Sequence, residues 1–273
     1  LLVMAFAAMS ALAQNPQADF KANVLKSGNN YCAYPYTEHP APALTAAPEG
    51  YKPFYIDHYG RHGSRWLIDP TQYTQPVAEL AKAERNGCLT PRGKQLLAQL
   101  REIVAGSEKR LGELTQVGAD QHRGIGRRMY ENFPEVFAGD ARVTARSSVV
   151  IRCILSMSNE LQELYAKNPR LRISEDASEA DMYYCAHGDS VINKIRRQKN
   201  AELKAFMKSC VHPENLCKRL FTDQKFVADS VDAALMMTNL WDVCSNQQSH
   251  YTDVQFYDLF TPTEVHQLWQ RTN

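Results

Sequence analysis

The chain has 273 residues, of which 44% are hydrophobic and 22% are charged. These proportions are typical of a soluble globular protein, and they exclude collagen, coiled coils and disordered chains. The 31 basic and 30 acidic side chains give a net charge of +1, which argues against a protein that mainly coats nucleic acid or an anionic membrane. We therefore expect no nucleic-acid partner, although this balance is compatible with a local basic pocket for a small anionic molecule.

The first thirteen residues form an apolar run that ends in the triplet Ala11-Leu12-Ala13, directly before the polar Gln14. A short apolar run that closes in small residues is typical of a secretory signal peptide. Residues 1–13 are therefore predicted to be a partial signal peptide, and the protein to be exported to the periplasm or outside the cell. A buried first helix is the alternative. No cysteine follows Ala13, so no lipid anchor in a membrane is expected.

Seven cysteines follow the predicted signal peptide, and export would permit disulfides. Cys210 and Cys217 are the best candidates for a local bridge because they are near neighbours in the chain. The odd number leaves one thiol free, or paired with a group outside the chain. The sequence has no Cys-x-x-Cys pair and its histidines are scattered, so we expect no zinc site, no other metal and no cofactor.

The part of the chain after the signal peptide begins without clear periodicity. Residues 14–50 contain five prolines, which predicts an irregular lead-in. Residues 53–59 are rich in aromatic side chains and precede Gly60, a turn signal, so they are predicted to form a strand.

Three helices are predicted next. An apolar face and Gly87 as a stop signal indicate a helix over residues 71–86. Thr90 and Pro91 then suit the cap and the first residue of a second helix. A third helix is predicted to begin at Thr115.

A second round of strand and helix follows. Residues 142–145 suit a short strand, and the apolar residues of 149–164 are spaced as the buried face of a helix. Residues 171–174 are a further candidate strand. This alternation is typical of the α/β class, and it predicts an α/β core over residues 51–186.

The last part of the chain, residues 187–273, is predicted to be a mostly helical and incomplete subdomain. Between residues 187 and 225 it carries nine basic and four acidic side chains. Residues 261–264, Thr-Pro-Thr-Glu, form a capping box that begins another helix. Because the chain stops at Asn273, soon after that helix begins, we expect the sequence to be a fragment that lacks the C-terminal part of the sheet domain.

A segment with the residues for catalysis directly follows the first predicted strand. It consists of Arg61, His62, Gly63, Ser64 and Arg65. Open α/β sheets bind ligands at the carboxyl ends of their strands, which is where this segment is expected. Guanidinium is a permanently charged, forked donor that suits phosphate oxygens, and Gly63 lets the backbone approach a ligand closely.

These groups would support phosphoryl transfer without a metal. A neutral ring nitrogen of His62 would attack phosphorus in line, while Arg61 and Arg65 stabilise charge on the equatorial oxygens. The departing alkoxide would also need a proton donor, because an alkoxide is a poor leaving group.

A third cation is expected at the end of the second predicted strand. Arg152 falls in the first turn of the helix that follows, where the backbone amides and the helix dipole also favour an anion. We expect Arg152, and not Arg146, to be the third phosphate ligand. The alternative is that Arg152 is an ordinary surface residue of the helix.

Residues 61–65 resemble the RHGxR signature of histidine acid phosphatases. Residues 146–156 resemble the R-S-[ST]-x3-R-x3-S block of the same family, and residues 258–264 are similar to the corresponding segment of its multiple inositol polyphosphate phosphatases, the phytase-like branch. The resemblance covers the chain from residue 51 to residue 273. It implies a histidine phosphatase-like sheet flanked by helices, with a mostly helical inserted subdomain.

The resemblance also implies an activity. His62 would be the nucleophile that becomes a phosphohistidine, and Arg61, Arg65 and Arg152 would hold the phosphate. The substrate would be a small phosphorylated molecule, an inositol polyphosphate such as phytate. A generic acid or sugar phosphatase of the same family is one alternative, and a non-catalytic binder of inositol phosphates is another.

One element of the family pattern is not found. The family has a distal His-Asp or His-Ala-Glu motif whose acid protonates the leaving group, and none of the eight histidines is followed by such a motif. The nearest imitation, His187-Gly188-Asp189, precedes the basic helical segment instead of following it. The chain by itself is therefore expected to be inactive.

Several residues near these motifs carry weaker predictions. Lys194, Arg197 and Lys199 are predicted to form a basic lip that holds the phosphates that are not being cleaved, with a solvated helix face as the equal alternative. His58 is expected to be structural. Asp57 is a weaker candidate for a residue that orients the site, whereas Trp66 and Tyr59 are expected to pack.

Overall fold

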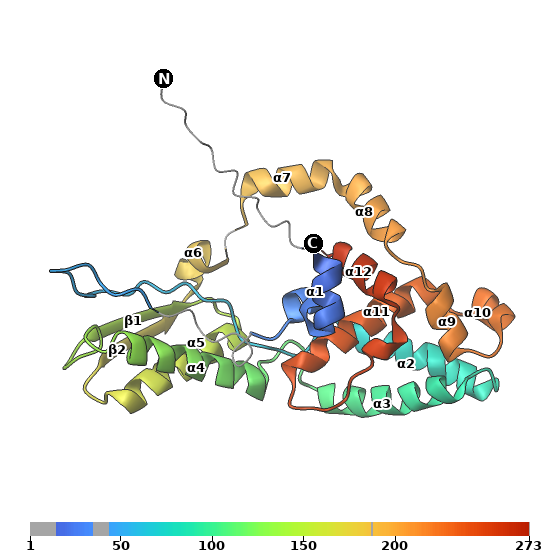
Figure 1. Cartoon of the computed structure of the whole chain (residues 1–273), viewed down its shortest axis with the longest axis horizontal. Coiled ribbons are helices and arrows are strands. Elements are labelled where there is room, and N and C mark those ends of the chain that lie inside the picture. The colour runs from blue at the N-terminus through green and yellow to red at the C-terminus, as the bar shows by residue number, and fades with distance from the viewer. Residues whose placement is uncertain (1–14, 35–43, 187, 273) are drawn as a thin grey trace, which may run out of the picture.

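The computed structural model of the protein describes residues 15–34, 44–186 and 188–272. It is mostly helical and contains a small parallel sheet (Figure 1). The predicted signal peptide lies outside the described residues. Within the described ranges, no helix combines the length and apolar character that crossing a membrane requires.

The elements follow one another along the chain in a helix-rich order. They are α1 (Pro16–Ala22), η1 (Val24–Tyr31), α2 (Pro70–Arg85), α3 (Pro91–Ser107), α4 (Gln116–Asn132), β1 (Arg142–Ser147), α5 (Ile151–Lys167), β2 (Arg172–Ala177), η2 (Glu179–Asp181), α6 (Met182–Ala186), α7 (Ser190–Gln198), α8 (Asn200–Ser209), α9 (Glu214–Leu220), α10 (Gln224–Ser230), α11 (Ala233–Asn246), η3 (Gln247–Ser249), η4 (Tyr257–Leu259) and α12 (Pro262–Gln270).

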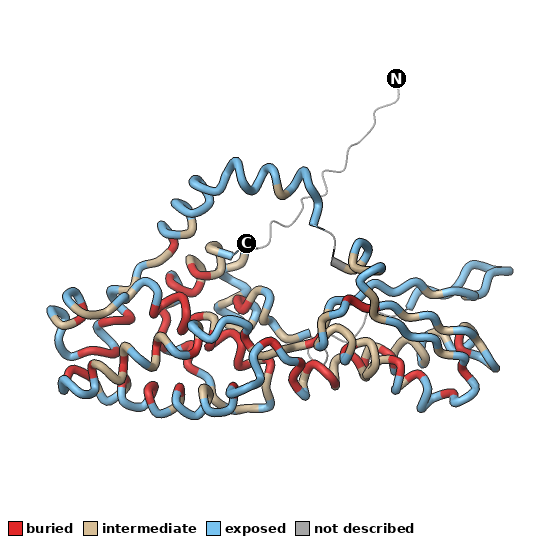
Figure 2. Tube along the Cα trace, turned by 180° about the vertical axis from the view of Figure 1, so that it is seen from behind, coloured by how far each residue is buried: buried red, intermediate tan, exposed pale blue. Residues whose placement is uncertain are grey.

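The larger hydrophobic core joins distant parts of the sequence. Helices α2 and α3 pack against α9 and α11, and α12 adds residues to the same core. Its largest buried side chains include Tyr73, Phe221 and Phe256. Figure 2 shows most of the buried residues in this helical half of the molecule. The domain boundaries predicted above stay predictions. In the structure, α2 and α3 share one hydrophobic core with the C-terminal helices.

The smaller core lies under the sheet. β1 and β2 pair in parallel, with Arg142 opposite Arg172, which confirms the strands predicted at 142–145 and 171–174. Helices α4 and α5 pack on each other and beside the strands. The four fully buried residues of this core are Phe137, Leu161, Leu164 and Leu171.

The predicted strand at residues 53–59 is wrong. This stretch is described but pairs with no strand, and the side chains of Phe54 and Tyr59 are 87% and 83% exposed. The segment and β1 both line a cavity of about 800 Å³. Because a strand is stabilised by hydrogen bonds to a neighbour, aromatic composition alone does not form one here.

The lead-in also differs from the prediction. Residues 16–31 are helical instead of irregular, because Asn15 caps α1 with Pro16 at its first position, and Asn23 caps η1. Helix α1 packs against α12, and η1 packs against α11 and α12.

The helix starts predicted from capping residues are confirmed. Thr90 and Thr115 accept backbone hydrogen bonds at the starts of α3 and α4, and Thr261 and Glu264 form both halves of the capping box of α12. The first predicted helix begins one residue earlier than expected, because Asp69 is its cap.

The predicted disulfide is not formed. Cys210 and Cys217 are both buried free thiols, as are Cys88 and Cys244. Cys210 terminates α8, whereas Cys217 lies in α9 and packs into the larger core, so the two residues belong to different helices.

Helices α4 and α5 approach each other closely because α4 carries a glycine at the contact. A Cβ atom added to Gly126 would lie 2.7 Å from the backbone oxygen of Glu160, too close for any neighbour to accommodate by side-chain motion alone. The backbone of one helix therefore rests on the other at this point.

We predict that Gly126→Ala lowers the free energy of unfolding by about 1–3 kcal/mol, because the added methyl group must push α4 away from α5. Gly106→Ala in α3 is the matched control. Its Cβ would meet only the ring of Trp66 at 3.5 Å, and alanine gains up to about 1 kcal/mol in helix propensity. Urea unfolding of both variants measures the difference. Equal stability of the two variants would contradict the close packing of α4 on α5.

Candidate active site

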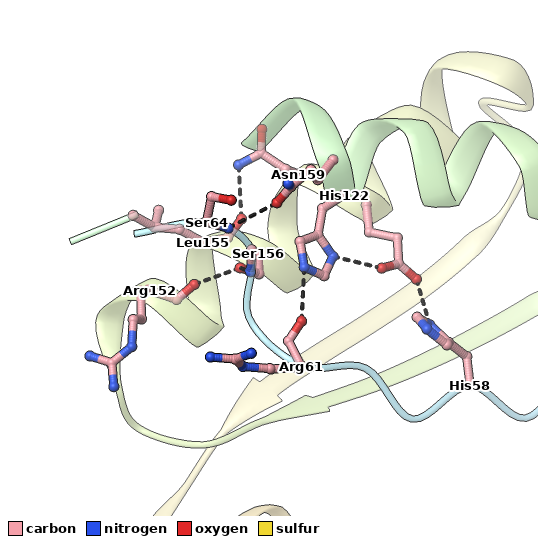
Figure 3. Close-up of polar contacts among 11 residues, drawn as sticks. His58, Arg61, Ser64, His122, Arg152, Leu155, Ser156 and Asn159 are labelled. Atoms are coloured by element: carbon pink, nitrogen blue, oxygen red, sulfur yellow. Dashed lines mark hydrogen bonds and ion pairs between the residues drawn. The ribbon is translucent and has the colours of Figure 1, made fainter. Parts of the chain in front are cut away.

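The segment that carries His62 has no regular secondary structure, and side chains of the surrounding helices hold its backbone. The amide of Gly63 donates to Ser156 Oγ on α5 at 3.0 Å. The amide of Ser64 donates to Gln121 Oε1 on α4 at 2.9 Å. The carbonyl oxygen of Ser64 accepts hydrogen bonds from the amide and the hydroxyl of Thr115. These contacts fix the segment against the N-terminal end of α4 and the first turns of α5 (Figure 3).

The next residues are anchored to the larger core. Asn246 on α11 donates through Nδ2 to the carbonyl oxygen of Arg65 at 2.9 Å, and the amide of Leu67 donates to the Tyr73 hydroxyl at 3.0 Å. Trp66 donates its amide to the carbonyl oxygen of Glu113. The segment therefore connects the two hydrophobic cores.

Gly63 is required by a backbone contact. A Cβ atom at this position would lie 2.4 Å from the carbonyl oxygen of Gly118, and one at Gly118 would lie 2.2 Å from the carbonyl oxygen of Ser64. Two glycines therefore let the loop lie directly on the first turn of α4. Any larger residue at either position would displace the loop.

The hydrogen bond of His62 identifies its free nitrogen. Nδ1 of the half-buried ring lies 2.8 Å from the carbonyl oxygen of Gly63. Because a carbonyl oxygen only accepts, Nδ1 carries the hydrogen, and the lone pair of the neutral ring is on Nε2. Nε2 is therefore the nucleophilic atom of this imidazole.

The surroundings keep the His62 ring neutral. Burial lowers the pKa of His62 below its usual value, and the positive charges of Arg152, Arg61 and Arg65 lower it further, against the opposing effect of the Gly63 hydrogen bond. A neutral ring has a lone pair available for attack near neutral pH.

The structure brings the three predicted arginines together around this ring. Burial lowers the pKa of Arg152 on α5, and the positive charges of Arg65 and Arg61 lower it further. The three guanidiniums are therefore close enough to repel one another. The Arg61 guanidinium points toward Arg152 across a gap in Figure 3. Nε of Arg65 and Nε of Arg152 are buried and have no hydrogen-bond partner among the described residues.

Such a cluster of cations is unfavourable without an anion, because like charges repel and a buried donor without a partner loses its hydration. Each guanidinium keeps one backbone contact: Arg61 with the carbonyl oxygen of Asn30, Arg65 with that of Trp66 and Arg152 with that of Gly112. The remaining donors suit a tetrahedral oxyanion.

Arg146, the alternative that the sequence analysis rejected, lines the cavity of about 800 Å³ together with His62, whereas Arg152 lines neither this cavity nor the second cavity beside His62. Arg146 is exposed, donates to the carbonyl oxygen of Ala145 and lies 3.6 Å from a carboxylate oxygen of Asp181. Its charge is therefore paired with Asp181, and the choice of Arg152 as the third phosphate ligand stays a prediction.

A cavity of about 580 Å³ opens beside His62. Arg61, Arg65 and Arg128 of α4 line it, and the guanidinium of Arg65 lies over the ring of Tyr31 with 5.7 Å between Cζ and the ring centroid. Its volume is in the range of small-molecule sites. The cavity therefore combines space for a ligand of moderate size with several positive charges.

The predicted basic lip lies outside the lining of both cavities beside His62. Lys194 and Arg197 are on α7, and Lys199 pairs with Glu202 at the start of α8. Helices α7 and α8 form an exposed arch (Figure 1 and Figure 2). The lip stays a prediction.

The rejected imitation motif, His187-Gly188-Asp189, supplies a helix cap. Asp189 caps α7, and His187 lies outside the described residues.

The neighbours of the motif have mixed outcomes. His58 makes a structural ion pair with Glu160 at 2.9 Å, as expected. Trp66 packs on the ring of His250, whereas Tyr59 is exposed instead of packed. Asp57 raises the pKa of His58, and its predicted orienting role stays a prediction.

Sequence analysis missed four residues that hold the site: Gln121, His122, Ser156 and Glu160. Gln121 and His122 lie six and seven residues after the predicted helix start at Thr115, on a helix whose apolar stripe is weak. The signal available in the sequence was a helix with a weak apolar stripe that carries several glycines and polar residues, which indicates contacts other than apolar packing. Ser156 is the last residue of the block 146–156, but the sequence pattern did not predict its contact with the amide of Gly63.

Comparison with known proteins identifies the fold. No family model matches the chain, and no curated protein does. A multiple inositol polyphosphate phosphatase from Bifidobacterium longum, solved in complex with inositol hexasulfate, matches 83% of this chain with a TM-score of 0.64 and 16% identity. Its complex with phosphate matches 83% of this chain with a TM-score of 0.62 and 17% identity. The phytase from D. castellii matches 99% of this chain with a TM-score of 0.65 and 16% identity.

These matches confirm the predicted histidine phosphatase fold. The chain spans 64%, 62% and 61% of the three matched chains, respectively. Identities of this size establish the fold alone.

We predict that Arg152→Met raises the pKa of the His62 ring, because it removes a nearby positive charge that disfavours protonation. Arg146→Met is the matched control, since Arg146 pairs with Asp181 and should leave the His62 pKa unchanged. NMR titration of the His62 ring in the wild type and both variants measures the shift. A larger effect of Arg146→Met than of Arg152→Met would contradict this arrangement of charges.

Proposed function

We propose that this chain, with its histidine phosphatase fold, hydrolyses phosphomonoesters through a phosphohistidine at His62, with inositol polyphosphates as the substrate class. The observation that carries the proposal is the neutral His62 ring, with its Nε2 lone pair, beside Arg61, Arg65 and Arg152. This combination supplies a nucleophile and three donors for phosphate oxygens.

The first half of the reaction is an in-line displacement. Nε2 of His62 donates its lone pair to phosphorus, and the bond between phosphorus and the ester oxygen breaks. That oxygen leaves with the bonding pair and takes a proton from a general acid. The guanidiniums of Arg61, Arg65 and Arg152 stabilise the negative charge on the equatorial oxygens as it redistributes.

In the second half a water molecule attacks the phosphorus of the phosphohistidine. The nitrogen-phosphorus bond breaks, its electron pair returns to His62 Nε2, and the water gives a proton to the conjugate base of the general acid as inorganic phosphate forms. The motif expected to supply the general acid does not occur in the sequence. The first step is therefore best studied with an ester whose leaving group departs without protonation.

The choice of substrate class has separate support. The cavity of about 580 Å³ is large enough for a six-membered ring, and its three lining arginines are suited to several phosphates on that ring. Similar structures were solved as complexes with phosphate and with inositol hexasulfate. Tighter binding of phytate than of glucose 1-phosphate, measured by calorimetry, would separate this class from a generic sugar phosphatase.

We predict that 4-nitrophenyl phosphate phosphorylates His62 and that His62→Ala abolishes the labelling, because nitrophenolate leaves without a general acid. Incubation, an alkaline quench that preserves phosphohistidine, and peptide mass spectrometry locate the phosphate. His212→Ala is the control, since this exposed histidine lies between α8 and α9 and lines neither cavity beside His62. Phosphate on another side chain, or undiminished labelling of His62→Ala, would reject the mechanism.

We also predict that the basic lip of Lys194, Arg197 and Lys199 contributes to the binding of inositol polyphosphates. Reversing the charges of Lys194, Arg197 and Lys199 together should raise the Kd for an inositol polyphosphate, measured by calorimetry, roughly tenfold, given up to about 1 kcal/mol for each exposed charge. The matched control reverses Lys94, Arg101 and Lys109, which are exposed on or after α3. An unchanged Kd in the first variant would reject the lip and leave a solvated helix face.

A further inference from the structure

A buried carboxylate links two histidines behind the catalytic segment. Glu160 on α5 has 12% of its side chain exposed, with Oε1 2.9 Å from His58 Nδ1 and Oε2 3.0 Å from His122 Nδ1. Burial alone would raise the pKa of Glu160, but the hydrogen bonds from His122 and His58 lower it overall. Glu160 is therefore a carboxylate acceptor for both rings.

The His122 ring has acceptors on both sides. Its Nδ1 faces the Glu160 carboxylate, and its Nε2 lies 3.1 Å from the carbonyl oxygen of Arg61 (Figure 3). A carboxylate and a carbonyl oxygen can only accept hydrogen bonds. Both nitrogens must therefore carry hydrogen for both contacts to form, which makes His122 an imidazolium whose counter-ion is Glu160.

The far end of this chain of contacts is the peptide bond before the nucleophile. The carbonyl of Arg61 belongs to the peptide that joins Arg61 to His62, so holding this oxygen fixes the peptide plane from which the His62 side chain projects. On the other side of His62, the amide of Gly63 is held by Ser156. His62 thus lies between two peptides that are anchored to α4 and α5.

We propose that His122, protonated on both ring nitrogens and held by Glu160, is a positioning residue that sets the orientation of His62 for attack. The inference rests on the proposed function, because it assigns His122 a task in phosphoryl transfer by His62. His122 lines the cavity of about 580 Å³, but its two ring nitrogens face Glu160 and the carbonyl oxygen of Arg61, so neither is available to the substrate. Its effect on rate comes from keeping Nε2 in line, where a displacement of about 1 Å can lower the rate roughly a hundredfold.

A second carboxylate on the same helix provides the matched comparison. Glu163 lies on α5 one turn after Glu160 and pairs with Arg127 on α4, with 3.0 Å between Nε and Oε1. That ion pair also links α4 to α5, but it does not reach residues 61–65. A purely structural role for Glu160 would therefore resemble the role of Glu163.

The test uses the full chain and the labelling of His62 by 4-nitrophenyl phosphate. In Glu160→Leu we expect the maximal labelling rate to fall roughly tenfold or more, with a half-saturating substrate concentration within about twofold of the wild type. In Glu160→Gln the rate should recover, because the amide nitrogen can donate to a neutral His122 that still donates to Arg61. Glu163→Gln should leave both quantities unchanged.

Nitrogen-15 NMR of the imidazole provides a readout that needs no catalysis. We expect both ring nitrogens of His122 to carry hydrogen in the wild type at neutral pH and only one to do so in Glu160→Gln. A wild-type His122 with one unprotonated nitrogen would overturn the inference even if His62 is phosphorylated. Equal losses of rate in Glu160→Leu and Glu163→Gln would overturn it as well. Conversely, a doubly protonated His122 in a protein that never labels His62 would reject the proposed function and retain the contact.

Discussion

The site depends on the hydrogen bonds that hold the backbone of an irregular loop. A helix or a strand satisfies its own amides and carbonyls, whereas residues 61–67 must find partners elsewhere. Ser156, Gln121 and Thr115 provide them from one side and Asn246 and Tyr73 from the other. The neighbours of the loop, and not its own sequence, supply these partners. The geometry of the candidate site is therefore a property of the helices around the motif as much as of the motif itself.

The same arrangement concentrates positive charge. Burial lowers the pKa of His62, and Arg152, Arg61 and Arg65 lower it further. Buried Nε atoms of Arg65 and Arg152 have no hydrogen-bond partner in the part of the chain that the structure describes. Holding these cations together lowers stability, and an anion that accepts their hydrogen bonds restores it. Ligand affinity and intrinsic stability therefore oppose each other at this site, as is common where binding sites are built in advance.

Local chemistry explains which elements the sequence could predict. Helix starts were found at Thr90, Thr115 and Thr261 because a cap is a short-range signal that depends on a few neighbouring residues. The prediction of a strand at residues 53–59 was wrong because a strand needs hydrogen bonds to a partner strand that is distant in the sequence. Arg61 and Arg65 were predicted from their places beside His62, and Arg152 from its place in the first turn of the helix that follows the second strand. His122 and Glu160 were missed because a buried pair separated by 38 residues leaves no periodic pattern.

The loop over residues 61–67 is anchored to the larger core through Asn246 and Tyr73 and to the smaller core through Ser156 and Gln121. A phosphate held by Arg65 and Arg152 would therefore act as a crosslink between two units that otherwise touch through few elements. Occupancy of the site would then increase the cooperativity of unfolding: the two cores would melt together when the anion is bound and more independently when it has left. In this protein the bound ligand would thus help to hold the two hydrophobic cores together.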